Sequence, residues 1–148
     1  MRILVFLTLF LFTANTYALG PEGHRIVGHI ASQRLSDKAN KRIKKILGDL
    51  NIYDKSIANW PDKIRRDMSW RRPYPSNNLW HYINIPYETE EQTLIDFTKK
   101  NTITWTTNEF TQRILSKKLT PQQEIEAISF LVHLLGKVHS KLHRWKHT

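Results

Sequence analysis

Residues 130–143 read FLVHLLGKVHSKLH, and this apolar run with its three histidines decides the fold. Positions 133 and 137 lie one helical turn apart, so their side chains share a face if the run is a helix. A single histidine on such a helix is usually a hydrogen-bonded core residue. Three histidines in one short segment, with others upstream, instead indicate a helix that faces a metal ion.

The first 18 residues have the features of a secretory signal peptide. Met1-Arg2 forms a short positive start, residues 3–14 are apolar, and Ala18 is the best candidate for the last residue before cleavage. The apolar stretch is too short for a permanent membrane helix. We therefore expect residues 1–18 to be removed, and residues 19–148 to form a secreted or periplasmic protein without stable membrane insertion.

The length of the chain, 148 residues, suits a single domain. The chain contains no cysteine, so it can form neither a disulfide framework nor a thiolate zinc site. Any bound metal must use histidine, carboxylate, backbone or water ligands. The formal net charge of +10 favours binding to polyanions. Charge alone does not separate nucleic acid from an anionic membrane surface.

Hydrophobic spacing and capping signals predict a mainly α-helical fold. Apolar residues recur at helical spacing between residues 22 and 35. Ser36 and Gly48 bracket a second helix, whose outer face is rich in lysine and arginine. That basic face is most simply a solvated surface, and contact with a polyanion is the alternative. Thr120 is the predicted N-cap of the last helix, because a proline and a glutamine follow one and three residues later.

The middle of the chain is less regular. Residues 56–68 read as a short helix that Pro61 kinks or restarts. Residues 71–78 are rich in proline, serine and asparagine and predict a loop. Residues 79–85 fit either a strand or an extended segment packed on helices. Further helices are predicted over residues 89–100 and 106–118.

The candidate metal ligands are spread along the whole chain. A hydrolytic zinc site needs nitrogen and carboxylate ligands, with a position left for water. His24 and His29 are separated by about 140° around a helix, so both cannot readily reach one ion. His133 and His139 are splayed in a similar way. At most one member of each pair should line a common pocket, and spacing does not choose between them.

Four ordered blocks carry a resemblance to a known family. Residues 19–24 read LGPEGH, residues 58–65 read ANWPDKIR, residues 79–84 read LWHYIN, and the fourth block is residues 130–143. They resemble the Trp-Gly-x-x-Gly-His start, the Ser-Trp-Ala-Asp-x-Ile-Arg and Trp-His-Tyr-Ile-Asn segments, and the Phe-Leu-Val-His-Leu-Val-Gly-Asp-Ile-His-Gln-Pro-Leu-His helix of the S1/P1 nucleases. The resemblance implies an all-α, phospholipase C/P1 nuclease-like helical bundle with a cluster of three zinc ions.

The resemblance also implies a ligand set. Asp62, His81 and His133 match ligands of one zinc, and Asp62 is the candidate catalytic base. His24 matches a ligand of a second zinc, together with the α-amino and carbonyl groups of the first mature residue, Leu19. His143 matches a ligand of the third zinc. His29 and His139 match no ligand and are expected to be core or surface residues.

Three departures from the family pattern concern the same zinc cluster. The family carries an aspartate that bridges two zinc ions where this chain has Lys137, whose charge opposes two nearby dications. Residues 140–141 are Ser-Lys rather than Gln-Pro. The sequence ends at Thr148, before the later ligands that join His143, so the bundle is expected to be incomplete at its C-terminus. His147 is a weak substitute for those ligands. The site of Asp62, His81 and His133 is therefore expected to be the one that persists, with one zinc or fewer bound.

The resulting prediction is an exported, zinc-dependent endonuclease that hydrolyses phosphodiester bonds of single-stranded DNA or RNA. Zinc supplies activated water in such an enzyme, and aromatic side chains stack the bases. Two alternatives are an inactive relative of these enzymes and a basic protein that binds nucleic acid or an anionic surface without catalysis.

Overall fold

The computed structural model describes residues 20–83 and 100–144, without the side chains of Arg71 and of residues 139–144. Within these ranges the chain is helical and has no strand, so the predicted all-α class is confirmed. The elements are α2 (Pro21–Ser32), α3 (Asp37–Leu47), α4 (Lys55–Ala58), α5 (Trp60–Arg65), the 3₁₀ turn η1 (Met68–Arg71), α6 (Ile103–Ser116) and α7 (Pro121–Arg144).

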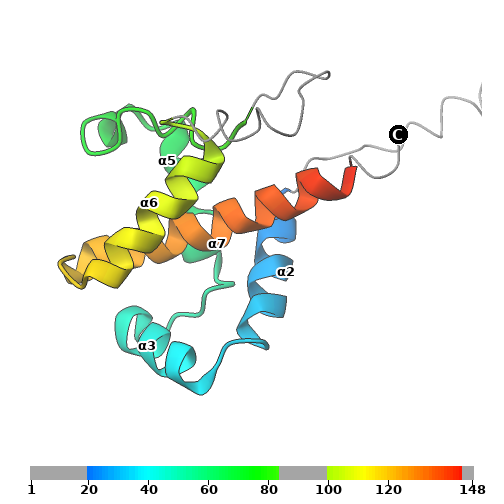
Figure 1. Ribbon diagram of the computed structural model, residues 1–148, viewed down its shortest axis with the longest axis vertical. Coiled ribbons are helices and arrows are strands. Elements are labelled where there is room, and N and C mark those ends of the chain that lie inside the picture. The colour runs from blue at the N-terminus through cyan, green and yellow to red at the C-terminus, as the bar shows by residue number, and fades with distance from the viewer. Residues whose placement is uncertain (1–19, 84–99, 145–148) are drawn as a thin grey trace, which may run out of the picture.

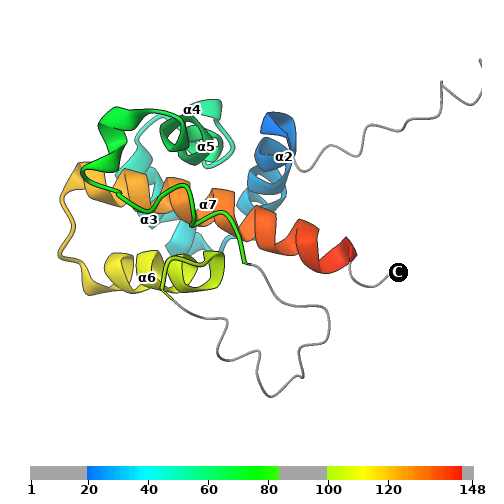
Figure 2. The same ribbon diagram turned by 90° about the horizontal axis from the view of Figure 1, so that it is seen from above.

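The long helix α7 is the element on which the others pack. It crosses the middle of the molecule and contacts α2, α3, α4, α5 and α6 (Figure 1). Seen from above, α6 lies along one side of α7, and α4 and α5 lie on the other side (Figure 2). The apolar run at residues 130–143 therefore belongs to the central helix of the fold.

Capping residues set the ends of the helices where the sequence predicts them. The side chain of Ser36 accepts a hydrogen bond from the backbone N–H of Ala39 and so caps α3. Gly48 ends α3 with a φ of 63°, a conformation that a residue with a side chain rarely adopts. At α7, the N–H of Thr120 donates to Gln123 Oε1 and the N–H of Gln123 donates to Thr120 Oγ1. This reciprocal pair is the predicted capping box.

The predicted helix over residues 56–68 is divided in two. It breaks at Asn59, which ends α4 and begins α5, and Pro61 lies in the first turn of α5. A proline in a first turn costs no hydrogen bond, because the N–H groups there have no helical partner. The break places the carbonyl of Ala58 and the side chain of Asp62 beside the middle of α7, where the candidate site lies.

Residues 79–83 form a turn followed by irregular chain, so the strand interpretation is wrong for the described part of this segment. The alternative interpretation, a segment packed on helices, describes it better. Trp80 is buried in the core and Ile83 packs against it. Residues 84–99 lie outside the described residues. This range includes the end of the segment and nearly all of the helix predicted over residues 89–100.

Two apolar clusters fix α7 on opposite sides. The first is aromatic: Phe130 is fully buried, stacks on Phe110 at 4.5 Å between ring centroids, and meets the rings of Trp60, Tyr74 and Trp80 edge-on. Burying one such side chain contributes about 1.5–3 kcal/mol to stability. The second cluster is aliphatic and joins α3 and α4 to α7; its buried members are Leu47, Ile52, Ile57 and Ile128. Because α7 is packed on both sides, it is a rigid platform for polar side chains.

Among the described residues, no helix combines the length and the apolar character that crossing a membrane would require.

Candidate metal centre

Polar side chains from four parts of the chain meet beside α7. They are His24 from α2, Asp62 from α5, His81 from the turn after residue 79, and His133 and Lys137 from α7. The three histidines are fully buried, whereas the Asp62 side chain is 32% exposed. A buried group of histidines with one partly exposed carboxylate is typical of a metal site rather than of an apolar core.

A backbone contact sets the orientation of the His133 ring. Its Nδ1 lies 2.9 Å from the carbonyl oxygen of Ala58, the last residue of α4. A carbonyl oxygen can only accept, so Nδ1 carries a proton and Nε2 is the ring nitrogen that faces the centre. Metal-binding histidines commonly donate their other ring N–H to a carbonyl in this way, which fixes the ring and its tautomer.

Three possible ligand atoms, one of them His133 Nε2, surround a common space. His133 Nε2 lies 3.2 Å from His81 Nδ1 and 3.5 Å from Asp62 Oδ1, and the last two atoms are 3.6 Å apart. The ligand atoms of a tetrahedral zinc ion, each about 2.0–2.1 Å from the metal, are roughly 3.3 Å from one another. The spacing of the three atoms therefore fits one zinc ion without rearrangement of the backbone.

The ammonium of Lys137 contacts two of these three atoms. Its Nζ lies 3.0 Å from His81 Nδ1 and 3.2 Å from Asp62 Oδ1. An ammonium has donors only, so His81 Nδ1 must accept and presents an electron pair. The Asp62 oxygen is likewise an acceptor, and His133 Nε2 presents an electron pair wherever that ring is neutral. A cation between the three atoms, a proton or a metal ion, makes their approach favourable.

His24 adds a further nitrogen ligand to the centre. Its ring stacks on that of His133 with 3.9 Å between centroids, and its Nε2 lies 3.7 Å from Asp62 Oδ2. Within residues 20–83 and 100–144, neither ring nitrogen of His24 finds a hydrogen-bond partner, although both are buried. His24, Asp62 and His133 each place one ligand atom within 4.8 Å of the others. Buried polar atoms without partners are rare and costly, and a bound metal would satisfy one of them here.

Burial keeps His24 and His81 neutral. Burial, followed by the neighbouring His133, lowers the pKa of His24 from 6.5 to about 3. Burial, followed by the charge of Lys137, lowers the pKa of His81 from 6.5 to about 2. Burial by itself would raise the pKa of Asp62, but its contacts with His133 and Lys137 outweigh that effect and hold it well below its usual value. Neutral imidazoles and an ionised carboxylate are the forms that bind a metal.

The structure brings four of the predicted ligands together: His24, Asp62, His81 and His133. Leu19 lies outside the described residues, and so does the side chain of His143, whose backbone belongs to α7. Their assignment as ligands stays a prediction, as does any part played by His139 or His147.

His29 lies away from the cluster. It is exposed, contacts Gln33 and meets the ring of Tyr53 edge-on. The structure thus places only one member of the His24–His29 pair in the centre, as the helical spacing required.

Two features around the cluster were not predicted from the sequence. One is the carbonyl of Ala58, which no side-chain pattern reveals. The other is Arg65, whose guanidinium lies 3.8 Å from Asp62 Oδ1 and donates to the hydroxyl of Tyr82 at 2.6 Å. A signal for Arg65 was present, because it ends the block ANWPDKIR three residues after Asp62 and so follows it by one helical turn.

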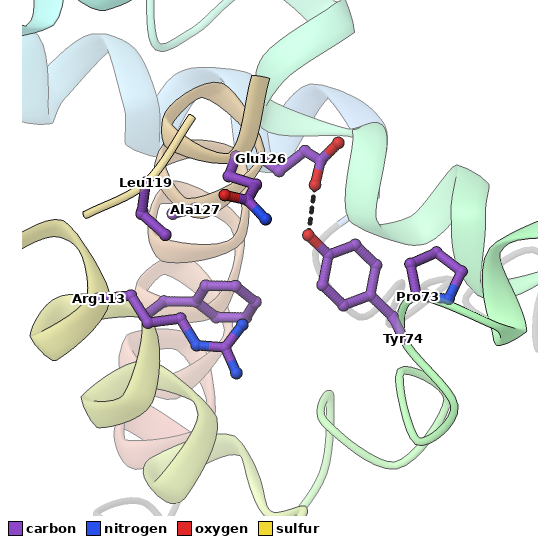
Figure 3. A pocket seen from close by; sticks show the side chains of 8 residues that line it. Pro73, Tyr74, Arg113, Leu119, Glu126 and Ala127 are labelled. Carbon is purple, nitrogen blue, oxygen red and sulfur yellow. Dashed lines mark hydrogen bonds between the residues drawn. The ribbon is translucent and has the colours of Figure 1, made fainter. Parts of the chain in front are cut away.

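A separate pocket of about 450 Å³ lies between α6, the start of α7 and residues 73–74. Figure 3 shows Tyr74 pointing across this pocket at Glu126, with Arg113 on the α6 side. None of the residues that line it belongs to the metal centre. The pocket and the histidine cluster are therefore distinct features of the molecule.

Fold and site together define the class: an all-helical protein whose central helix and its neighbours converge on a buried histidine–carboxylate centre. The family model of the S1/P1 nucleases matches residues 19–148. The chain therefore belongs to the S1/P1 nuclease family, and its resemblance to that family is confirmed.

Several curated relatives agree with this assignment. The chain is 28% identical to Endonuclease 2 of Arabidopsis thaliana, over 95% of this chain and 51% of that protein. It is 28% identical to Nuclease P1 of Penicillium citrinum, over 84% of this chain and 46% of that protein. It is 25% identical to Nuclease S1 of Aspergillus oryzae, over 86% of this chain and 45% of that protein. The chain thus spans about half the length of these relatives.

Proposed function

We propose that this chain is an exported, zinc-dependent endonuclease that hydrolyses phosphodiester bonds in single-stranded DNA or RNA. Membership of the S1/P1 nuclease family supports the reaction class. The observation that carries the proposal is the convergence of His133 Nε2, His81 Nδ1 and Asp62 Oδ1 at 3.2–3.6 Å from one another. These three ligand atoms have the spacing that one zinc ion requires.

Zinc is the ion that this set of ligands suits best. Two imidazole nitrogens and one carboxylate oxygen form a usual catalytic zinc set, which leaves a fourth position open. We assign Asp62, His81 and His133 to this ion. His24 and the terminal amino and carbonyl groups of Leu19 belong to a second position, and His143 to a third, as the family resemblance implies. One zinc or fewer per chain is expected, because Lys137 replaces the bridging aspartate.

The residues of the centre have defined tasks in hydrolysis. Zinc, when bound, polarises a phosphoryl oxygen and lowers the pKa of bound water. The Asp62 side chain is partly exposed beside the centre, which makes its carboxylate the candidate to accept the proton of an attacking water. The carbonyl of Ala58 keeps His133 in one orientation throughout. Arg65, held by the hydroxyl of Tyr82, places a second positive charge beside the carboxylate, where an anionic phosphate would approach.

Export and the nucleic-acid substrate rest on other observations. Residues 1–18 have the pattern of a signal peptide, and cleavage after Ala18 would free the amino group of Leu19 for metal binding. The formal charge of +10 favours a polyanionic substrate. Preference for single strands follows from the family resemblance.

A second candidate function is binding of nucleic acid without hydrolysis, and the outer face of α3 favours it. Lys38, Lys41, Lys44 and Lys45 are all exposed along this helix. Such a row attracts a phosphate backbone whatever the state of the metal centre. This candidate predicts binding that survives loss of the histidine cluster.

The decisive experiment measures zinc per chain by elemental mass spectrometry, on protein processed to begin at Leu19. We expect about one zinc, lost on Asp62→Ala or His133→Ala substitution. Zinc-loaded protein is then assayed on single-stranded DNA, single-stranded RNA and duplex DNA. Cleavage of single strands that stops with a chelator supports the proposal. A folded protein without zinc overturns it, and retained nucleic-acid binding in that sample supports the second candidate.

A further inference from the structure

Lys137 occupies an unusual position for a lysine. It lies one helical turn after His133 on α7, and its side chain is 17% exposed. Its ammonium reaches two of the three atoms assigned to zinc, His81 Nδ1 at 3.0 Å and Asp62 Oδ1 at 3.2 Å. A lysine pointing into solvent would be an ordinary surface residue, whereas this one is built into the centre.

The charges of the centre limit how many metal ions it accepts. Among His24, Asp62, His81, His133 and Lys137, only Asp62 is negative, and Lys137 already pairs with it. One dication added beside Asp62 leaves a positive centre that an anionic substrate can neutralise. A second dication would share that single carboxylate with the first ion and with the ammonium, at separations where repulsion between like charges is strong.

Zinc binding also changes what the ammonium can bond to. The unprotonated Nδ1 of His81 has one electron pair, so zinc and the Lys137 ammonium cannot both use it. When zinc takes this pair, the ammonium loses the acceptor that it contacts at 3.0 Å. A phosphate oxygen is a suitable replacement, because a lysine ammonium on its flexible stem binds phosphate as a point charge.

We propose that Lys137 is the second cation of the centre: one zinc ion and the fixed ammonium of Lys137 together bind the phosphate group of the substrate. This inference rests on the proposed function and adds to it a stoichiometry of one metal ion and a phosphate-positioning residue. Lys137 therefore weakens zinc binding by repulsion and strengthens phosphate binding by attraction.

The test measures both expected effects of Lys137, weaker zinc binding and stronger phosphate binding. Zinc affinity, zinc stoichiometry and the affinity of zinc-loaded protein for phenylphosphonate are measured by isothermal titration calorimetry. Phenylphosphonate is a phosphate analogue that cannot be hydrolysed, so the readout does not depend on activity. The variants are Lys137→Met, which removes the charge, and Lys137→Arg, which keeps it. Lys63→Met is the matched control, because Lys63 is exposed and neighbours Asp62 in the sequence.

For K137M we expect zinc to bind about 10-fold more tightly, since removing a like charge near a dication is favourable. We expect phenylphosphonate to bind about 10-fold more weakly, since a charge-assisted hydrogen bond is lost. K137R should keep phenylphosphonate binding, and K63M should match the wild type in both measurements. Far-UV circular dichroism checks the fold, and Lys137→Gln replaces K137M if the methionine variant does not fold.

The possible outcomes separate this inference from the proposed function. If the wild-type chain binds no zinc, both fail. If it binds one zinc but the neutral variant binds zinc less tightly, or binds phenylphosphonate equally well, only the role of Lys137 is overturned. Two or more zinc ions per wild-type chain also overturn it, because the ammonium then does not replace a metal ion.

Discussion

Two buried polar groups lie on the same helix, α7, and they differ in whether their polar atoms all have hydrogen-bond partners. At its start, Glu126 accepts a hydrogen bond from the hydroxyl of Tyr74 (Figure 3). It accepts another from Gln122, so each carboxylate oxygen has a donor. In its middle, His133 belongs to a cluster whose polar atoms are not all paired. There, both ring nitrogens of His24 lack a hydrogen-bond partner among the residues that the structure describes.

The difference separates a structural polar group from a functional one. Burial and the neighbouring Glu126 raise the pKa of Tyr74, which therefore stays a neutral donor to that carboxylate. The pair is complete and needs no ligand. The histidine cluster is incomplete without a cation, and incomplete buried polar groups are expected at sites that bind one. The substitutions in the predictions alter one of these two groups or the helix contact beside the centre.

The largest expected effect follows Asp62→Asn. The substitution keeps the shape of the side chain but removes the only negative charge of the centre. We expect zinc affinity to fall on the order of 100-fold or more, because loss even of an indirect supporting group typically costs 10–100-fold. Titration with zinc against a competing chelator measures the affinity. Tyr74→Phe, at the complete pair, should leave zinc affinity unchanged, and an equal loss in both variants would remove the distinction between the two groups.

The second prediction concerns the stability of the zinc-free protein as a function of pH. The pKa values of His24 and His81 are about 3 and about 2 when folded, against 6.5 for the free side chain. The unfolded chain therefore takes up protons below pH 6.5 that the folded chain does not. Stability falls as the pH is lowered from 6.5 toward 3, by about 1 kcal/mol per pH unit for each histidine.

Urea denaturation in the presence of a chelator, between pH 7 and pH 4.5, measures this slope. His24→Gln should make it shallower, whereas Y74F should shift the whole curve without changing its slope in this range. The exposed His29 on the same helix offers the control His29→Gln. A wild-type slope in H24Q would show that His24 is not held neutral by the fold.

Local signals in the sequence predicted most of the helical framework. Ser36, Gly48 and Thr120 cap the predicted helices, because capping depends on neighbours within four residues. The segment at residues 79–83 was ambiguous. Its aromatic and β-branched residues favour a strand, but in this fold Trp80 is buried against α6 and α7 rather than in a sheet.

The centre was predictable only in part. The resemblance gave the residues, and helical geometry showed that His24 and His29 could not both take part. The sequence could not reveal which atoms face one another. The tautomer of His133 depends on the carbonyl of Ala58, 75 residues away in the chain, and the placement of the Lys137 ammonium depends on how α5 packs against α7. Such contacts come from tertiary packing, which single-sequence patterns do not record.

The third prediction concerns the hydrogen bond between Tyr74 and Glu126. Tyr74→Phe removes the donor to Glu126 Oε2 and leaves that carboxylate, which is 7% exposed, with one donor fewer. We expect a loss of about 1–3 kcal/mol in the free energy of unfolding, the usual cost of leaving a buried polar atom unpaired. Urea denaturation at pH 7 measures it. A stability equal to that of the wild type would mean that water replaces the hydroxyl through the adjoining pocket.

The smallest expected effect follows Gly136→Ala, at the contact between α7 and α2. A Cβ atom at this position would lie 3.3 Å from Val27 Cγ1 and 3.7 Å from His24 Nδ1, so α2 must shift by a few tenths of an ångström. The better helix propensity of alanine, worth about 1 kcal/mol, should offset the strain in stability.

If zinc is held by Asp62, His81 and His133, G136A should weaken zinc binding by no more than about threefold, or about 0.6 kcal/mol, because a displaced His24 is not a ligand of that ion. The same chelator competition used for D62N measures the change. A loss close to that of D62N would instead assign the ion to the group of His24, Asp62 and His133, which also places its ligand atoms within reach of one metal. Gly136→Ala therefore distinguishes an ion on the His81 side of the Asp62 carboxylate from an ion on its His24 side. D62N cannot make this distinction, because it alters both sides.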